Sequence, residues 1–181
     1  EAFFDVATAL GVRKLGIVAG VVGPVPYDKE REISCIYSLP HMKKDLAKYA
    51  VKFSDYEGGV TIGTYLVQEA ESRGLEAFSL YAYVPAYNFS PSPTTFQGLR
   101  IERDYKAWYD LMRRFNYMFR LGFDLSELKA QSEALIASMD SKIEEMQQAM
   151  PDVDIREYLK KVDEQFTEMP FMPLEDVWER E

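Results

Sequence analysis

Two long apolar runs, each preceded by a helical segment, constrain the fold of this chain more than any other feature. Residues 14–22 form a nearly continuous apolar run of strand length, and residues 75–84 form a second, which Pro85 is predicted to end. Such runs are typical of strands buried on both faces of a parallel sheet. The segments before them are predicted to be helices that end in left-handed caps at Gly11 and Gly74. This alternation predicts an α/β body with a mostly parallel sheet and helices on its faces.

The segment between the two runs is predicted to contain a loop, a short strand and two helices. Residues 23–27 include two prolines and interrupt the first strand as a loop at the edge or rim of the sheet. Residues 33–38 return to β-type composition, and residues 41–53 carry apolar positions between lysines, which predicts a helix. A second helix is predicted over 62–73, with Thr61 or a neighbour as its N-cap.

The last third of the chain is predicted to be helical, without a further strand. Apolar residues recur at helical spacing between 101 and 119, which predicts a helix with one apolar face. Asp124 and Glu127 have the spacing of a capping box at the start of a long helix that Pro151 ends. Asp154 is predicted to cap a last helix.

These patterns predict two parts. Residues 1–98 are expected to be the C-terminal part of an α/β domain, and residues 99–181 a helical extension with an irregular apolar tail. The chain opens at Glu1, without Met and inside a predicted helix. We therefore expect it to be an N-terminally incomplete piece of a longer protein.

The charge balance of the chain is acidic. It has 21 Lys and Arg against 30 Asp and Glu, a formal net charge of −9 and a pI of about 4.8. Phosphate groups and anionic lipids attract basic surfaces, so we expect neither a nucleic-acid nor a membrane partner. Cys35 and His41 are the only residues of their types. We therefore predict no internal disulfide, no metal site, no cofactor and a reducing, cytoplasmic setting.

Two arrangements could carry chemistry, and each has a plainer interpretation. Gly16, Gly20 and Gly23 lie on and after the first strand, but their spacing matches no phosphate-loop motif, and close backbone packing explains them. Cys35 and His41 could form a nucleophile pair, whereas a buried Cys is commonly a small hydrophobe. We therefore predict no catalytic residues and favour a role that is not enzymatic.

The best candidate for ligand binding precedes the second predicted helix. The candidate residues are Glu57, Gly58, Gly59, Thr61 and Tyr87. The first four place backbone N–H groups and a hydroxyl at a helix N-terminus, where an anion can bind. Tyr87 is near a strand end, where open α/β sheets bind ligands. The alternative is a simple helix cap with a flexible approach.

The long predicted helix carries an apolar face wider than one line of packing requires. The residues expected at an interface with a partner or a second copy are Leu135, Met139, Met146 and, from the second apolar run, Tyr83. Methionine side chains adapt to different partners. The alternative is intramolecular, because the helices over 101–119 and 155–166 could cover the same face.

Several segments resemble the PAC2 family, the proteasome assembly chaperone 2 type. The residues that carry the resemblance are Ser54-Asp55-Tyr56-Glu57-Gly58-Gly59-Val60-Thr61, Tyr65-Leu66, Ala70, residues 73–80, Val84-Pro85-Ala86-Tyr87 and Ser92-Pro93. The resemblance implies a three-layer α/β/α body similar to the purine nucleoside phosphorylase fold, in a chaperone-like or uncharacterised protein that often self-associates. Ala86 stands where the family often has His, so a role that needs an imidazole there is lost.

The residues that carry this resemblance are structural types, and likeness to a phosphorylase fold does not carry its activity. We therefore predict a non-catalytic, chaperone-like or protein-interaction protein that forms homo-oligomers. The alternative is a binding protein or enzyme for a small molecule, a nucleoside or phosphate, on a phosphorylase-like fold.

Overall fold

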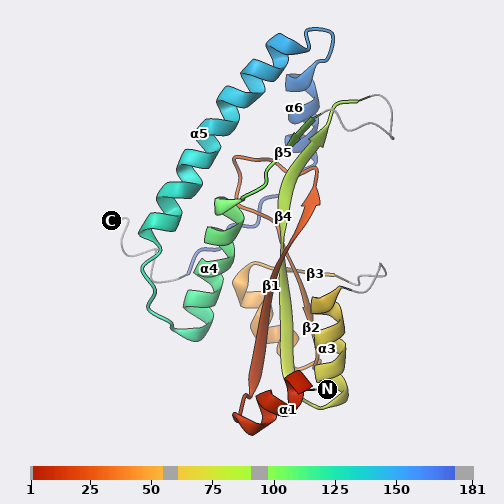
Figure 1. Ribbon diagram of the computed structural model, residues 1–181, viewed down its shortest axis with the longest axis vertical. Coiled ribbons are helices and arrows are strands. Elements are labelled where there is room, and N and C mark those ends of the chain that lie inside the picture. The colour runs from red at the N-terminus through yellow and green to blue at the C-terminus, as the bar shows by residue number, and fades with distance from the viewer. Residues whose placement is uncertain (1, 55–60, 91–97, 174–181) are drawn as a thin grey trace. The chain divides into compact units, whose positions relative to one another are not determined.

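The computed structural model describes residues 2–54, 61–90 and 98–173 (Figure 1). Its elements are α1 (Ala2–Ala9), β1 (Lys14–Gly23), β2 (Ile33–Tyr37), α2 (Met42–Leu46), the 3-10 helix η1 (Ala47–Tyr49), β3 (Lys52–Phe53), α3 (Ile62–Ser72), β4 (Glu76–Asn88), β5 (Gly98–Arg100), α4 (Tyr105–Phe119), α5 (Ser126–Ala149) and α6 (Ile155–Gln165). The fold is mixed α/β, with a central sheet and helices on both sides of it, which confirms the predicted fold class.

The described strands form one sheet in the order β1-β4-β2-β3, and β5 pairs with β4 outside this path. β2 and β3 are parallel, with Ser34 opposite Lys52. β5 is antiparallel to the end of β4, with Ala86 opposite Arg100. Among the described strands, β1 therefore lies at one end of the order and has a single hydrogen-bonded neighbour.

Packing divides the chain into two units, and the first comprises the described residues within 1–19 and 33–81. Its hydrophobic cluster contains Phe4, Val67, Ala70 and Ala77. Gly11 after α1 and Gly74 after α3 are both left-handed, with φ of 68° and 66°, as predicted. Thr61 caps α3, also as predicted, because its side chain accepts the N–H of Thr64. Glycine and threonine thus set both helix boundaries by local chemistry.

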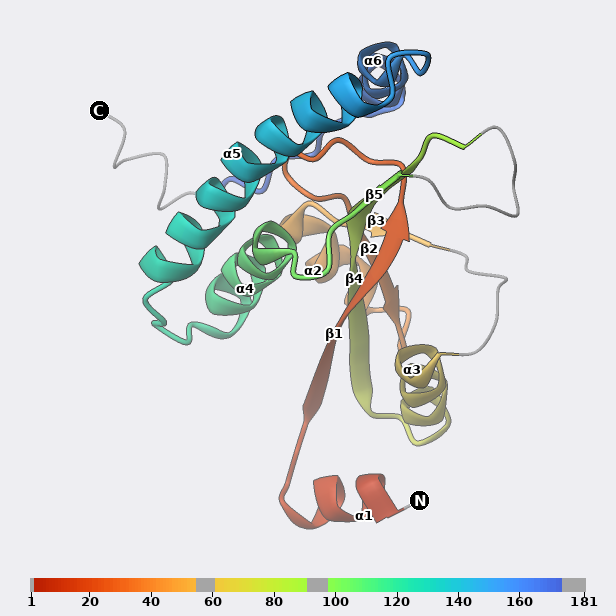
Figure 2. The ribbon, with the colours of Figure 1, turned by 45° about the horizontal axis from the view of Figure 1, so that its top comes forward.

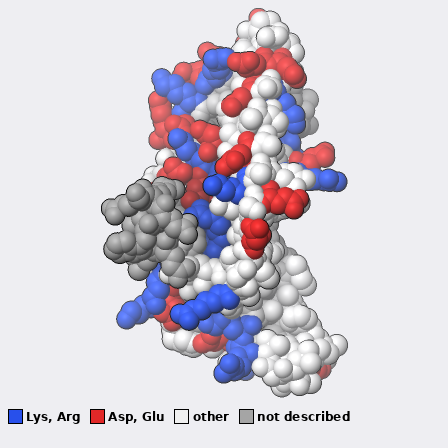
Figure 3. Space-filling view, turned by 90° about the vertical axis from the view of Figure 1, so that its left-hand side faces the viewer, with Lys and Arg blue, Asp and Glu red and all other residues white. Residues whose placement is uncertain are grey.

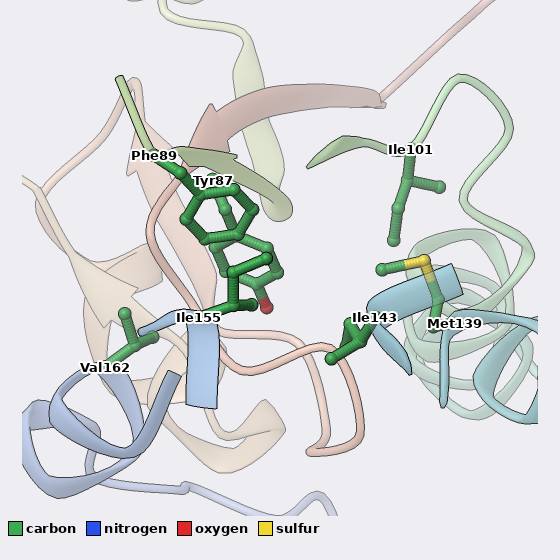
Figure 4. Close-up of a cluster of buried hydrophobic side chains, with 7 residues drawn as sticks. All are labelled: Tyr87, Phe89, Ile101, Met139, Ile143, Ile155 and Val162. Atoms are coloured by element: carbon green, nitrogen blue, oxygen red, sulfur yellow. The ribbon is translucent and has the colours of Figure 1, made fainter. Parts of the chain in front are cut away.

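The second unit comprises the described residues within 20–32 and 82–181. Within it, α5 and α6 lie side by side (Figures 1 and 2). A cluster of buried side chains joins these helices to the end of β4 and consists of Tyr87, Phe89, Ile101, Met139, Ile143, Ile155 and Val162 (Figure 4). Asp154 caps α6, as predicted, by accepting the N–H of Glu157 at 2.9 Å.

β1 is not buried on both faces, and this part of the prediction is wrong. Every residue of β1 keeps some exposed surface, and Val18, Val21 and Val22 are exposed. The reason is that β1 lies at the end of the described strand order, so only one neighbour covers it. An apolar run does not by itself distinguish a central strand from a strand at an end.

The second apolar run does not end at Pro85. β4 continues to Asn88, and β5 is a strand that the sequence did not predict. Pro85 lacks an N–H group, but the pairing with β5 begins only at Ala86, so the proline interrupts none of those hydrogen bonds.

Two helix predictions also differ from the structure. The helix expected over 41–53 ends at Tyr49, because Ala50 adopts a left-handed conformation with φ of 49° and β3 follows. The capping box expected at the start of α5 does not form. Asp124 instead accepts the N–H of Ser126 at 2.9 Å, and the N-cap residue of α5 is Leu125.

Candidate functional site

The loop after β1 is folded around a buried cation. Arg31 in this loop, which spans residues 24–32, has a fully buried side chain. Its guanidinium pairs with the carboxylate of Asp104 at 2.8 and 3.2 Å. It also donates to three main-chain carbonyls of the same loop at 2.9 to 3.1 Å. Paired, charge-assisted hydrogen bonds of this kind fix the path of the loop.

α4 contributes further buried charges one turn apart. Asp110 accepts the N–H of Arg31 at 2.8 Å and pairs with Lys106 at 3.2 Å. Burial raises the pKa of Asp110 above the ordinary carboxyl value, and Lys106 opposes this shift. Arg114 donates to Glu30 at 2.8 Å, and burial lowers the pKa of Arg114. Each of these carboxylates has a cationic partner, so the cluster stabilises the loop and offers neither a free base nor a nucleophile.

A groove with a cavity volume of about 440 Å³ opens within the same unit. It is lined by Gly20, Val22, Val84, Arg100, Ile101, Glu102, Asp104 and Trp108, and we call it the Trp108 groove. Trp108 is 47% exposed and Val22 is 50% exposed. A Cβ at Gly20 would lie 3.4 Å from Val84, in van der Waals contact with the strand face below. The groove therefore combines an exposed aromatic ring, an apolar strand face and charges of both signs.

The residues predicted to bind an anion are only partly within the described structure. Glu57, Gly58 and Gly59 lie outside the described residues. Thr61 Oγ1 lies 3.2 Å from the N–H nitrogen of Thr64 and 3.1 Å from the hydroxyl of Tyr81. Ser79 in the same unit is fully buried, and its hydroxyl has no hydrogen-bond partner among the described residues. Anion binding at this helix start stays a prediction.

Tyr87 and the predicted interface residues belong to the second unit. Tyr87 is fully buried and donates its hydroxyl to the carbonyl of Val25 at 2.7 Å, and burial raises its pKa. Met139 is 1% exposed and lies in the cluster of Figure 4, against which Leu135 and Met146 pack. These contacts agree with the intramolecular alternative for α5, and an interface role stays a prediction.

The ring of Tyr83, the remaining predicted interface residue, is half-buried on β4. A Cβ at Gly23 would come within 3.1 Å of this ring. The glycine therefore lets the backbone of β1 approach the aromatic ring closely, and the interface role of Tyr83 also stays a prediction.

Cys35 and His41 do not form a nucleophile pair. Cys35 has no exposed surface, and burial raises the pKa of its thiol to about 12. The reactive thiolate is therefore scarce at neutral pH. His41 instead lies 2.8 Å from one carboxylate oxygen of Glu76, and Lys14 lies 2.9 Å from the other. Lys14 and Glu76 form an ion pair near the surface, and His41 is hydrogen-bonded to the same carboxylate.

Charged side chains of both signs are interspersed on the face drawn in Figure 3. Within the described residues, no group of three or more His, Cys, Asp or Glu side chains is placed to hold a metal ion. None of the helices in the described ranges has the length and apolar character needed to span a bilayer. The Trp108 groove is therefore the candidate functional site, because it combines an exposed aromatic ring with a defined cavity.

The sequence pattern did not predict this groove, because it indicated the wrong face of α4 as the inner one. The aromatic and apolar positions between 101 and 119 predicted the inner face of a helix. The residues that α4 buries are instead Ala107, Asp110, Leu111 and Arg114. Two charged residues thus lie inside and Trp108 lies outside. The signal for the inner face was a second set of positions at helical spacing, in which apolar and charged residues alternate: Ala107, Asp110, Leu111 and Arg114.

Comparison with known proteins agrees with this architecture. The family model described as the PAC2 family matches residues 1–143 of the 181. No curated protein matches the chain. A PAC2 family protein from Streptomyces avermitilis is similar in structure, with a TM-score of 0.68 and 22% identity over 87% of this chain and 57% of that chain.

Two further solved structures are similar to this chain. A proteasome-assembly chaperone homologue from Mycobacterium tuberculosis has a TM-score of 0.64 and 19% identity over 77% of this chain and 53% of that chain. An archaeal homolog of proteasome-assembly chaperone from Pyrococcus furiosus has a TM-score of 0.55 and 18% identity over 83% and 57%. At these identities the likeness shows the fold alone. The chain spans little more than half the length of these proteins.

Proposed function

The chain belongs to the PAC2 family, and from this membership we propose that it is a non-catalytic, chaperone-like protein that associates with a second copy of itself and binds protein partners in the cytoplasm. Two of the similar structures are described as homologues of proteasome-assembly chaperones, which supports a role in protein interaction. The division into an α/β part over 1–98 and a helical extension over 99–181 is part of this proposal.

The observation that carries the proposal is the Trp108 groove. A half-exposed Trp and an exposed Val place aromatic and apolar surface side by side in this groove, and aromatic side chains are enriched at protein interfaces. Arg100 and Glu102 supply both signs of charge at the same groove. In a two-fold interface one patch meets its own copy, so charges of both signs on that patch can pair across it. We assign the groove to association between two copies of this chain.

Analytical ultracentrifugation of Trp108→Glu tests this assignment. We expect the wild-type chain to dimerise and the variant to stay folded by circular dichroism, because Trp108 is half-exposed. Truncating a central interface Trp commonly costs about 2 kcal/mol or more, so the dimer dissociation constant should rise at least about 30-fold.

Tyr65→Glu is the matched control, because Tyr65 on α3 is also 47% exposed but lies in the other unit and lines no part of the groove. We expect this variant to dimerise like the wild type. Equal weakening in both variants would indicate general charge repulsion, and an unchanged dimer in Trp108→Glu would remove the groove from the interface. A wild-type chain that stays monomeric at all concentrations would contradict self-association.

A further inference from the structure

The segment after α6 has one buried side chain, which anchors it to the rest of the second unit. Residues 166–173 form no helix or strand. Phe171 is 3% exposed, whereas Met169 and Met172 beside it are 41% and 66% exposed. A peptide fixed at one anchor residue, with its neighbours in water, has the form of a bound ligand rather than of a core element.

The ring of Phe171 lies among three side chains of α4. Tyr117 meets it edge to face, with ring centroids 5.8 Å apart. The guanidinium carbons of Arg113 and Arg114 lie 5.7 and 5.1 Å from the ring centroid. Such cation–π and edge-to-face contacts favour an aromatic ring over an aliphatic side chain of similar size.

Charged side chains also bind both main-chain groups of Phe171. Its N–H donates to Glu30 Oε1 at 3.0 Å, and its carbonyl accepts from Arg113 Nη2 at 2.8 Å. Three residues earlier in the tail, Glu168 Oε1 accepts the N–H of Glu30 at 2.9 Å. Packing of a ring needs none of these bonds. Recognition of an extended peptide by its backbone and one anchor side chain needs both kinds of contact.

Two of the receiving side chains are held in place by contacts that do not involve the tail. Glu30 and Arg114 form their own ion pair at 2.8 Å, and Arg114 also donates to the carbonyl of Asp110 at 2.8 Å. The adjacent Arg31 is fixed by its pair with Asp104. We call Glu30, Arg113, Arg114 and Tyr117 the Phe171 socket.

We propose that the Phe171 socket is a peptide-recognition site, and that its intramolecular occupant, the tail over 166–173, is replaced by an extended segment of a partner protein that carries an aromatic residue. The tail covers the socket in the free chain because a tethered ligand has a high effective concentration. A partner segment of the same chemistry displaces it by binding the same four side chains. This proposal is independent of the Trp108 groove.

Fluorescence anisotropy on the full chain tests the proposal. The probe is a labelled peptide with the sequence of residues 167–173. We expect Phe171→Ala, which removes the competing ring, to bind this peptide saturably and at least tenfold more tightly than the wild type. We expect a second peptide, with Ala in place of Phe171, to show no saturable binding.

Two further variants separate the socket from general charge effects. Adding Arg113→Ala to Phe171→Ala should weaken peptide binding at least tenfold, because the carbonyl donor and one face of the ring site are lost. Adding Lys142→Ala, which removes one positive charge from the exposed side of α5, should leave binding unchanged. No saturable binding to a folded Phe171→Ala chain, or equal binding of both peptides, would overturn the proposal.

Hydrogen exchange on the wild-type chain tests the same proposal if Phe171→Ala does not fold. We expect the amide of Phe171 to exchange at least tenfold faster than the buried amides of α4, through release of the tail alone. Equal protection of the tail and α4 would mean that the tail leaves only when the unit unfolds, and would overturn the proposal.

Discussion

Asp104→Asn is expected to destabilise the chain far more than the same substitution at Asp154, although both residues cap a helix. Asp104 accepts the N–H of Ala107 at 3.0 Å at the start of α4, and Asp154 accepts the N–H of Glu157 at 2.9 Å at the start of α6. The difference is that Asp104 also pairs with the fully buried side chain of Arg31. The comparison therefore isolates the buried ion pair from the cap.

The expected magnitude follows from what each substitution removes. Asn caps a helix about as well as Asp, so capping contributes little to either change in stability. Loss of a negative charge at the helix start costs about 0.3–1 kcal/mol at both sites. Removing one partner of a buried ion pair costs about 3–5 kcal/mol more. We take the lower end, about 3 kcal/mol, because Arg31 keeps its three carbonyl acceptors.

Urea unfolding followed by circular dichroism measures both variants. A cost of about 3 kcal/mol for Asp104→Asn is a large part of the 5–15 kcal/mol typical of a folded domain. Asp154→Asn should lose no more than about 1 kcal/mol. Equal losses at the two caps would refute the reasoning.

Two further predictions concern the first unit. Cys35 should not react with a thiol reagent at pH 8 in the folded chain and should react once the chain is unfolded, because burial raises its pKa to about 12; rapid labelling of the native chain would contradict this. Gly63→Ala should cost about 1–3 kcal/mol in urea unfolding, because the new Cβ would lie 2.5 Å from the hydroxyl of Tyr81 and 3.1 Å from that of Ser79. Adding Tyr81→Phe removes the atom nearest to the new Cβ and should recover part of the lost stability. An unchanged stability of Gly63→Ala would instead show that the first turn of α3 shifts to make room for the Cβ.

The elements that the sequence predicted correctly depend on local chemistry. The left-handed glycines after α1 and α3, and the caps Thr61 and Asp154, are set by residues within one turn of each helix end. Two of the elements that differed depend on partners far along the chain, whereas the early end of the helix at Ala50 and the missing capping box of α5 are local differences. The exposure of β1 follows from its place at the end of the strand order, and β5 exists because it pairs with the end of β4. Neither pairing is visible in a local pattern.

The candidate site was hidden from the sequence for one physical reason. Arg31 lies in a run of alternating charges at residues 28–32, which is typical of a solvated loop, and its carboxylate partner is 73 residues away. α4 turns its charged residues toward this loop and buries Asp110 and Arg114. Since a helix has only one inner face, the stripe that contains Trp108 must then lie outside. The buried ion cluster and the exposed aromatic groove therefore both follow from the orientation of α4 about its own axis. A substitution that releases Arg31 is expected to loosen the loop and the groove together.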